Sequence, residues 1–314
     1  GVSQFSLNIK TIIDKIASTE SRVLISGPSG SGKKFTARLI HNLSQRSNFP
    51  IIFANTKRLL SEDIEIELFG HENKEGIVTK IGLVEQAHNG TLVIDEIANL
   101  SNTVQSRFVK LLTEKCFYRV NGKFPIDIDI RLISSTSNNI LDKVKENQFR
   151  EDLYYRLNVV PIKLIKLNDR TEDIPFFIDH FLKVCSEKLG VPQRKITPDS
   201  YNLLQSTKWD GNIRQLKNVI EQLIILGPKN ADEPLTVNVL TQNKEGSTND
   251  LAEFMQKSML SLSLKEAREL FEREYIKLQM MRFNNNVSKT AVFIGMERSA
   301  LHRKLKSLNI KEIY

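Results

Sequence analysis

The sequence contains only two cysteines, Cys116 and Cys185, in 314 residues. They lie far apart, and neither has a second cysteine or a histidine at the spacing of a zinc site, so the pattern indicates neither a disulfide framework nor a zinc centre. The five histidines are scattered and form no metal-binding pattern. We interpret both cysteines as ordinary thiols, because free cysteine is most often simply buried.

Long apolar runs are also missing. No stretch of about 18 consecutive apolar residues occurs, and the first residues lack a basic segment followed by an apolar one. The sequence therefore predicts neither a membrane span nor a signal peptide, and we expect a soluble cytoplasmic protein. Its 40% hydrophobic and 26% charged residues are ordinary for a globular chain with a sizeable core.

Acidic residues are outnumbered by basic ones, 37 to 45, which gives a formal net charge of +8. Such an excess favours a polyanionic partner, although net charge bears on association and not on fold.

Short β-rich runs alternate with helical patterns from residue 22 onward. The runs lie at residues 23–26, 51–54, 91–94, 130–134 and 159–162, and they are almost continuously apolar, as strands buried on both faces must be. The alternation predicts an α/β fold with a parallel sheet between helices. We expect this core to occupy residues 1–168.

The strand signal stops after residue 168. Apolar residues then recur at helical spacing in residues 173–188, 198–207 and 213–226, which predicts a small helical lid subdomain over residues 169–240. Residues 241–263 include Gly-Ser-Thr-Asn and have the composition of a linker. Residues 264–314 show helical patterns only and are expected to form an all-α domain.

A glycine-rich loop follows the first predicted strand and precedes a helical pattern, which is the context that a P-loop requires. In such a loop the backbone N–H groups turn inward around phosphate oxygens, and the lysine reaches the outer phosphates. The sequence therefore predicts a site for ATP or ADP. The residues of the loop are Gly27, Pro28, Ser29, Gly30, Ser31, Gly32 and Lys33.

The residue after the P-loop lysine departs from the usual motif. This position normally carries a Ser or Thr hydroxyl that binds Mg²⁺, and here it is Lys34. Downstream, an apolar strand ends in Asp95, suited to holding Mg²⁺, and Glu96, suited to polarising an attacking water. Lys34 leaves open whether the metal site is intact.

Seven ordered motifs resemble the AAA+ domain of NtrC-type bacterial regulators, especially the NtrX-like branch, and the resemblance covers essentially the whole chain. Besides the P-loop, the motifs are Glu-Leu-Phe-Gly-His-Glu at residues 67–72, Glu-Gln-Ala at 85–87, Gly-Thr-Leu at 90–92, Ile-Asp-Glu at 94–96, Phe-Arg-Glu-Asp-Leu-Tyr-Tyr-Arg-Leu at 149–157 and Trp-Asp-Gly-Asn-Ile-Arg at 209–214. In that family the position of Lys34 is often Glu, so the missing hydroxyl need not abolish nucleotide binding.

The resemblance implies roles for further residues. Asn55 would be the switch that holds the catalytic Glu96, and Thr136 with Ser137 occupies the first sensor region. Arg214, in the lid, would contact the γ-phosphate as the second sensor.

Two arginines would act on a neighbouring subunit. The family's hexamers reach the nucleotide of the next subunit with arginines that match Arg150 and Arg156, whose guanidinium groups stabilise charge on the transferred phosphoryl group.

One family motif is missing. Activators of the sigma-54 RNA polymerase carry Gly-Ala-Phe-Thr-Gly-Ala on a loop after the Phe-Gly-His-Glu segment, whereas residues 73–82 here read Asn-Lys-Glu-Gly-Ile-Val-Thr-Lys-Ile-Gly. The loop is shorter and contains no aromatic residue. Only Ile77 and Val78 could form an exposed apolar tip, and we expect no remodelling of sigma-54 polymerase.

The C-terminal part resembles the Fis-type helix-turn-helix that closes the family. Residues 287–296 and 297–308 read as two helices around a glycine-containing turn, with Ala291, Ile294, Leu301 and Leu305 as the small core. Five basic and no acidic residues between 298 and 311 predict salt-dependent binding of double-stranded DNA. The expected DNA contacts are Ser299, His302, Arg303, Lys304 and Lys306.

Other partners follow from the resemblance. An amphipathic stretch at residues 264–283 would form a dimer that reads paired half-sites, and the AAA+ surface leaves a hexamer open as well. A receiver domain absent from this chain, phosphorylated by a sensor kinase, would control the regulator. Two alternatives stay open: an active ATPase that remodels RNA polymerase or another partner through the shortened loop, and a DNA-binding module with a vestigial nucleotide pocket.

Overall fold

The structure is a computed structural model that describes residues 1–56, 63–227, 233–237, 263, 272–273, 275–276, 280 and 286–308. The chain divides into two compact units. The first contains residues 1–195 and 205–233, and the second contains residues 196–204 and 234–314. The predicted linker at residues 241–263 lies outside the described residues except for Ser263.

A five-stranded parallel sheet forms the centre of the first unit, in the order β2-β5-β8-β1-β9. It confirms the predicted α/β fold, and each predicted strand is present with ends shifted by no more than two residues. The strands are β1 (Val23–Ser26), β2 (Ile51–Asn55), β5 (Thr91–Asp95), β8 (Arg131–Thr136) and β9 (Val160–Lys163).

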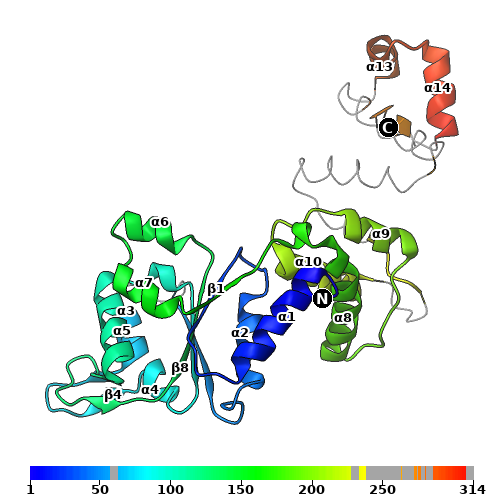
Figure 1. Cartoon of the computed structure of the whole chain (residues 1–314). Helices are drawn as coiled ribbons and strands as arrows, with labels where there is room; N and C mark the ends of the chain where they lie inside the picture. Colours follow the sequence, from blue (N-terminus) through cyan, green and yellow to red (C-terminus); the bar gives the residue numbers. More distant parts are fainter. Residues whose placement is uncertain are drawn as a thin grey trace. The chain divides into compact units, whose positions relative to one another are not determined.

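Helices cover both faces of this sheet (Figure 1). Successive side chains of a strand point to opposite faces of the sheet. Val93 of β5 therefore packs in the apolar cluster on one face, and its neighbours Leu92 and Ile94 pack in the cluster on the opposite face. The first face carries α1 (Gln4–Ala17) and α2 (Lys33–Asn42); the second carries α3 (Asp63–Phe69), α4 (Leu83–Gln86), η1 (Ile97–Asn99), α5 (Asn102–Glu114), α6 (Ile140–Lys145) and α7 (Glu151–Leu157).

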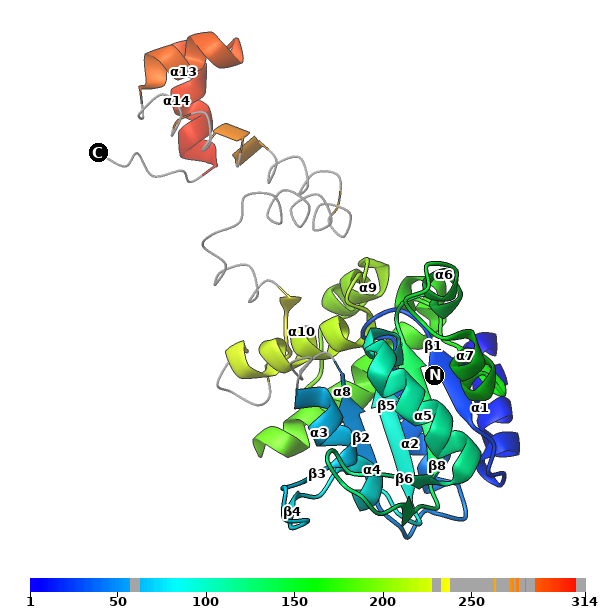
Figure 2. The same ribbon diagram turned by 90° about the vertical axis from the view of Figure 1, so that its left-hand side faces the viewer.

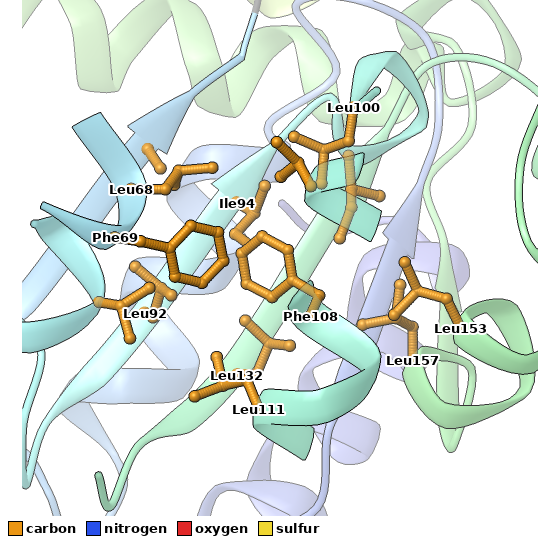
Figure 3. Close-up of a cluster of buried hydrophobic side chains, with 14 of the residues drawn as sticks. Leu68, Phe69, Leu92, Ile94, Leu100, Phe108, Leu111, Leu132, Leu153 and Leu157 are labelled. Atoms are coloured by element: carbon orange, nitrogen blue, oxygen red, sulfur yellow. The ribbon is translucent and has the colours of Figure 1, made fainter. Parts of the chain in front are cut away.

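The larger apolar cluster lies on the second face, where Figure 3 shows Phe69 and Phe108 side by side above the sheet residues Leu92 and Leu132. The two ring centroids are 5.4 Å apart and the rings are tilted by 53°, a favourable geometry for aromatic pairs. This packing fixes α3 and α5 on the sheet.

One buried charge, that of Arg131, holds α1 at its C-terminal end. Arg131, at the start of β8, is 1% exposed and donates hydrogen bonds to the carbonyl oxygens of Ala17 (2.9 Å) and Ile16 (2.7 Å). Burial lowers the pKa of Arg131. The guanidinium therefore connects the last turn of α1 to β8 through two backbone carbonyls.

Two short antiparallel hairpins extend the first unit: β3 (His71–Glu72) with β4 (Val78–Lys80), and β6 (Cys116–Phe117) with β7 (Ile126–Asp127). Arg119 ties this region together through ion pairs with Glu72 (2.8 Å) and Glu85 (2.7 Å). The hydrogen bond to Glu85 is the largest cause that raises its pKa.

The loop between β3 and β4 is a tight turn. The backbone N–H of Asn73 donates to the carbonyl of Ile77 (3.0 Å), and the side-chain oxygen of Asn73 accepts from the backbone of Glu75 and Ile77. Ile77 and Val78 are exposed, at 58% and 42%. The prediction of a short loop with a small apolar tip is confirmed.

Helices follow the last strand. After η2 (Leu167–Asp169) and η3 (Thr171–Asp173), α8 (Ile174–Leu189) packs on α10 (Asn212–Leu226), and α9 (Pro198–Ser206) lies between them in sequence. The three predicted helices are present. The view in Figure 2 shows α8 and α10 beside each other.

The second unit contains the helix-turn-helix, α13 (Val287–Ile294) and α14 (Arg298–Ser307). Ala291, Leu301 and Leu305 are buried and Ile294 is partly buried, so the predicted core is confirmed, and Ile276 and Met280 add to it. Gly295 makes the turn in a left-handed conformation (φ +69°). The other residues of the stretch at 264–283 are largely outside the described part of the chain.

Cys185 is buried and Cys116 is partly buried, and neither is in a disulfide. Among the described residues no group of His, Cys, Asp and Glu side chains could hold a metal ion on its own. No described helix is both long enough and apolar enough to cross a membrane.

We predict that Phe108→Ala lowers the free energy of unfolding by about 3–5 kcal/mol, because it leaves a cavity against Phe69 and the sheet. Phe124→Ala is the matched control, since Phe124 is 77% exposed and its loss should change stability by less than about 0.5 kcal/mol. Urea unfolding followed by circular dichroism measures both. Equal losses would contradict the assignment of the core.

Candidate nucleotide site and nucleic-acid interface

The P-loop connects the carboxyl end of β1 to the start of α2, so its backbone lies where ligands bind open parallel sheets. Gly32 is the N-cap of α2 with φ +108°, and Gly30 has φ +76°. A Cβ atom at Gly30 would lie 2.3 Å from the carbonyl oxygen of Gly211. Glycine is therefore required at Gly30 both by the backbone and by the close approach of the segment before α10.

Lys33 is 7% exposed and lies inside the P-loop. Its ammonium donates to the carbonyl oxygens of Gly27 (2.8 Å) and Pro28 (3.3 Å) and lies 3.6 Å from a carboxylate oxygen of Glu96. The loop thus concentrates a cation and the N-terminus of α2 in one place, an arrangement that suits phosphate.

Glu96 follows β5 and is 4% exposed in a left-handed conformation (φ +59°). Its carboxylate accepts hydrogen bonds from the backbone N–H of Ser137 (2.9 Å) and from the Ser137 hydroxyl (2.8 Å). Residues other than glycine rarely adopt this left-handed conformation, and those that do often belong to a functional site. The geometry places the carboxylate beside Lys33.

Three other residues that the sequence analysis selected lie near this end of the sheet. Asn55 and Asp95 are neighbours in register at the ends of β2 and β5. Thr136, at the end of β8, donates its hydroxyl to the carbonyl of Asn138, so within the first sensor region it is Ser137 that contacts Glu96.

The residues around Asp95 are compatible with a magnesium ion. Its carboxylate accepts a 2.5 Å hydrogen bond from the Ser135 hydroxyl, which orients it. Lys34 is exposed, and its ammonium lies 4.6 Å from the ring centroid of Phe53, a cation–π contact. Mg²⁺ is usually held by one or two carboxylates together with phosphates and waters, and Asp95 offers one such carboxylate.

Side chains from the helices after β9 hold the P-loop. The Asn212 amide donates to the carbonyl of Ser29 (3.0 Å), and its oxygen accepts from the backbone of Leu167 (2.8 Å). The Arg214 guanidinium lies 3.3 Å from the Ser29 hydroxyl, so it contacts the P-loop. Arg170 donates to the carbonyl of Ser31 (2.9 Å).

Arg150 and Arg156 lie at the ends of α7. Arg150 is bound to Asp152 through two hydrogen bonds of 2.9 and 2.7 Å, and that interaction raises its pKa. Arg156 contributes to the lowering of the Arg22 pKa, whose largest cause is burial. Arg22 immediately precedes β1, and Arg156 shortly precedes β9, which runs parallel to β1. Both arginines therefore lie near the starts of these strands, whereas the P-loop follows the end of β1.

The second candidate site is α14. Ser299, His302 and Arg303 are exposed on it, and Ser299 and His302 line a shallow hollow with Glu297 and Arg298. Lys304 is different, because its ammonium forms a 2.9 Å ion pair with Glu272. The side chain of Lys306 lies outside the described residues.

Two residues at the P-loop were not selected from the sequence. Asn212 belongs to the Trp-Asp-Gly-Asn-Ile-Arg motif at residues 209–214. Its position next to a glycine is a signal from which a buried amide could have been suspected. Arg170 lies in the segment Asp-Arg-Thr-Glu-Asp at residues 169–173, in which only Thr171 is uncharged. Such a segment is typical of an exposed turn, so no local signal indicates that Arg170 is buried.

The chain matches three families in sequence order. Residues 1–163 match the family described as Sigma-54 interaction domain, residues 168–257 the AAA+ ATPase lid domain, and residues 267–308 the Fis family of bacterial regulatory proteins. The first match alone covers more than half of the chain.

Relatives are similar along nearly the whole chain. The nitrogen assimilation regulatory protein NtrX of Azorhizobium caulinodans is 42% identical over 99% of this chain and 68% of its own length. Crystal structures of NtrX from Brucella abortus in complex with ATP and with ADP are 41% and 40% identical, cover 99% of this chain and 69% of that protein, and give a TM-score of 0.72. The chain therefore spans about two thirds of these relatives.

Proposed function

The chain belongs to the NtrC family of bacterial transcription regulators, on its NtrX branch, and we propose that it is a DNA-binding regulator whose AAA+ domain binds ATP and ADP as a switch. The observation that carries the proposal is the geometry of the P-loop. Asn212 and Arg170 bind its carbonyl groups from outside, and its Lys33 lies beside Glu96, which follows β5.

The nucleotide would bind with its phosphates in the P-loop. Lys33 would leave the carbonyls of Gly27 and Pro28 for the outer phosphates, and Asp95 would hold Mg²⁺, which supplies charge neutralisation when it is bound. Arg214 is already beside Ser29 and would respond to the outermost phosphate. The crystal structures of NtrX from Brucella abortus in complex with ATP and with ADP support nucleotide binding by this chain.

Hydrolysis would be slow and would require a second copy of the chain. Glu96 is held by Ser137 and would need release before it could polarise a water. Arg150 and Arg156 match the arginines that the family uses in trans, so both would act on the nucleotide of a neighbouring subunit. Arg150 would first have to leave Asp152. Asn55, beside Asp95, would be the residue that accepts Glu96 in a different arrangement.

The shortened β3–β4 turn supports a role other than activation of the sigma-54 polymerase. Its tip has only Ile77 and Val78, closed by the Asn73 hydrogen bonds, and lacks an aromatic anchor. We therefore favour a regulator that works through DNA over one that remodels polymerase. The alternative is an active ATPase that uses this turn on another partner.

DNA would bind along α14. The exposed Ser299, His302 and Arg303 would contact bases or phosphates in the major groove. Lys306 stays a predicted contact. A dimer would place two such helices on paired half-sites, and a receiver domain with its sensor kinase would set the balance of states, as the family suggests.

We predict that the chain binds ADP and ATP, and that Lys33→Ala weakens binding by about 10- to 100-fold, because one charged contact to phosphate is lost. Glu96→Gln should keep binding and remove any turnover. Lys10→Ala, an exposed lysine of α1, is the control. Calorimetric titration with and without Mg²⁺ and a phosphate-release assay measure both quantities; absence of nucleotide binding by the wild type would favour a vestigial pocket.

We predict that Arg303→Ala weakens DNA binding and reduces the slope of log affinity against log salt by about one. Lys304→Ala should change the slope less, because Glu272 already neutralises its ammonium. Fluorescence anisotropy of a labelled duplex at several KCl concentrations measures both variants. Equal slopes for the two would contradict the assigned face of α14.

We predict no ATP-dependent open complex when the chain is added to sigma-54 holoenzyme on a suitable promoter. The physical reason is the missing aromatic anchor on the β3–β4 turn. Permanganate footprinting detects melted DNA, and a regulator that carries Gly-Ala-Phe-Thr-Gly-Ala serves as the positive control. Melting by this chain would instead support the remodelling alternative.

A further inference from the structure

A buried pair of opposite charges, Arg170 and Asp173, lies between the start of α1 and the P-loop. Asp173 is fully buried and Arg170 is 7% exposed. Their closest charged atoms are 4.0 Å apart, so the pair is held mainly by its other partners. Those partners come from two different segments of the first unit.

Asp173 binds the start of α1. Its carboxylate accepts hydrogen bonds from the backbone N–H groups of Val2 (2.6 Å) and Ser3 (2.7 Å), and from the hydroxyls of Ser3 (2.9 Å) and Ser6 (2.6 Å). Burial alone would raise the pKa of Asp173, but these hydrogen bonds outweigh it and lower the pKa. The carboxylate is therefore the anchor of this helix end.

Arg170 binds the P-loop. Its guanidinium donates to the carbonyl of Ser31 (2.9 Å) and lies over the ring of Phe5, in the first turn of α1, at 5.4 Å from the centroid. One side chain thus contacts both the P-loop and the helix that Asp173 anchors.

Two polar atoms in this cluster have no hydrogen-bond partner, although they are buried: the Nε of Arg170 and the hydroxyl of Ser31. Leaving a buried donor unsatisfied is costly. The Ser31 hydroxyl belongs to the loop in which the phosphates of a nucleotide would bind, so this cluster adjoins the proposed nucleotide site.

We propose that Arg170 and Asp173 couple the P-loop to the start of α1, so that nucleotide binding and the docking of residues 2–6 stabilise each other. Both would be positioning residues: Arg170 would act through the carbonyl of Ser31, and Asp173 through the hydroxyls of Ser3 and Ser6. The proposal rests on the nucleotide binding proposed above. Because coupling between two sites is reciprocal, it has two observable sides.

The first test is the variant Ser3→Ala/Ser6→Ala, which removes two hydroxyl donors to Asp173 and leaves the P-loop unchanged. We expect ADP affinity, measured by calorimetric titration of the 314-residue chain, to fall by about fivefold or more. Thr11→Ala/Ser18→Ala is the matched control, because those hydroxyls bond only within α1 itself. Ser3→Thr/Ser6→Thr restores the donors and should restore the affinity.

The second test is hydrogen exchange, measured by mass spectrometry, of the peptide that covers the first turns of α1. ADP should slow its exchange about fivefold or more in the wild type, and less in Ser3→Ala/Ser6→Ala. A purely structural role of the two serines would speed exchange in the variant without changing its response to ADP. If the double variant does not fold, as judged by circular dichroism, Ser6→Ala alone replaces it.

The outcomes separate the two proposals. ADP affinity within twofold of the wild type in a variant whose α1 start exchanges faster overturns the coupling and leaves the nucleotide site intact. A wild type that binds no ADP overturns both the nucleotide switch and the coupling.

Discussion

The hold of the helical segments on the P-loop is the interaction on which the rest of the first unit depends. Asn212 and Arg170 donate to the carbonyls of Ser29 and Ser31, and a glycine at Gly30 permits the backbone of Gly211 to come close. Because Arg170 and Asn212 bind these carbonyl groups, the backbone N–H groups of the loop can point toward a ligand. The P-loop follows β1 of the sheet, and these helical segments fix its carbonyl groups by hydrogen bonds.

Further contacts connect the P-loop to other elements of the first unit, which nucleotide binding could therefore affect. Lys33 links the loop to Glu96, Ser137 links Glu96 to β8, and Arg214 extends from the start of α10 to Ser29. A phosphate that draws Lys33 away from the loop carbonyls would change each of these contacts. In the proposed function, nucleotide binding itself would be the signal, and the small apolar tip of the β3–β4 turn is consistent with that role.

Much of the fold can be predicted from the sequence because its signals are local. Parallel strands buried on both faces are continuous apolar runs, and all five lie within two residues of the predicted ends. The P-loop and the helix-turn-helix core were recognised for the same reason. What could not be predicted depends on distant partners. Asp173 is buried against the start of α1, Arg170 is buried against α1 and the P-loop, and Lys304 is neutralised by Glu272, 32 positions earlier. Roles that the family suggests for Asn55, Arg150 and Arg156 remain predictions.

The central claim is that the P-loop and the start of α10 respond to nucleotide as one body. Amide hydrogen exchange of residues 27–36 and 211–216, with and without ADP, tests it most directly. The account predicts that ADP slows exchange in both segments, with equal dependence on ADP concentration, and that Asn212→Ala removes the effect at residues 211–216. Protection confined to the P-loop, with α10 unchanged in the wild type, would contradict it.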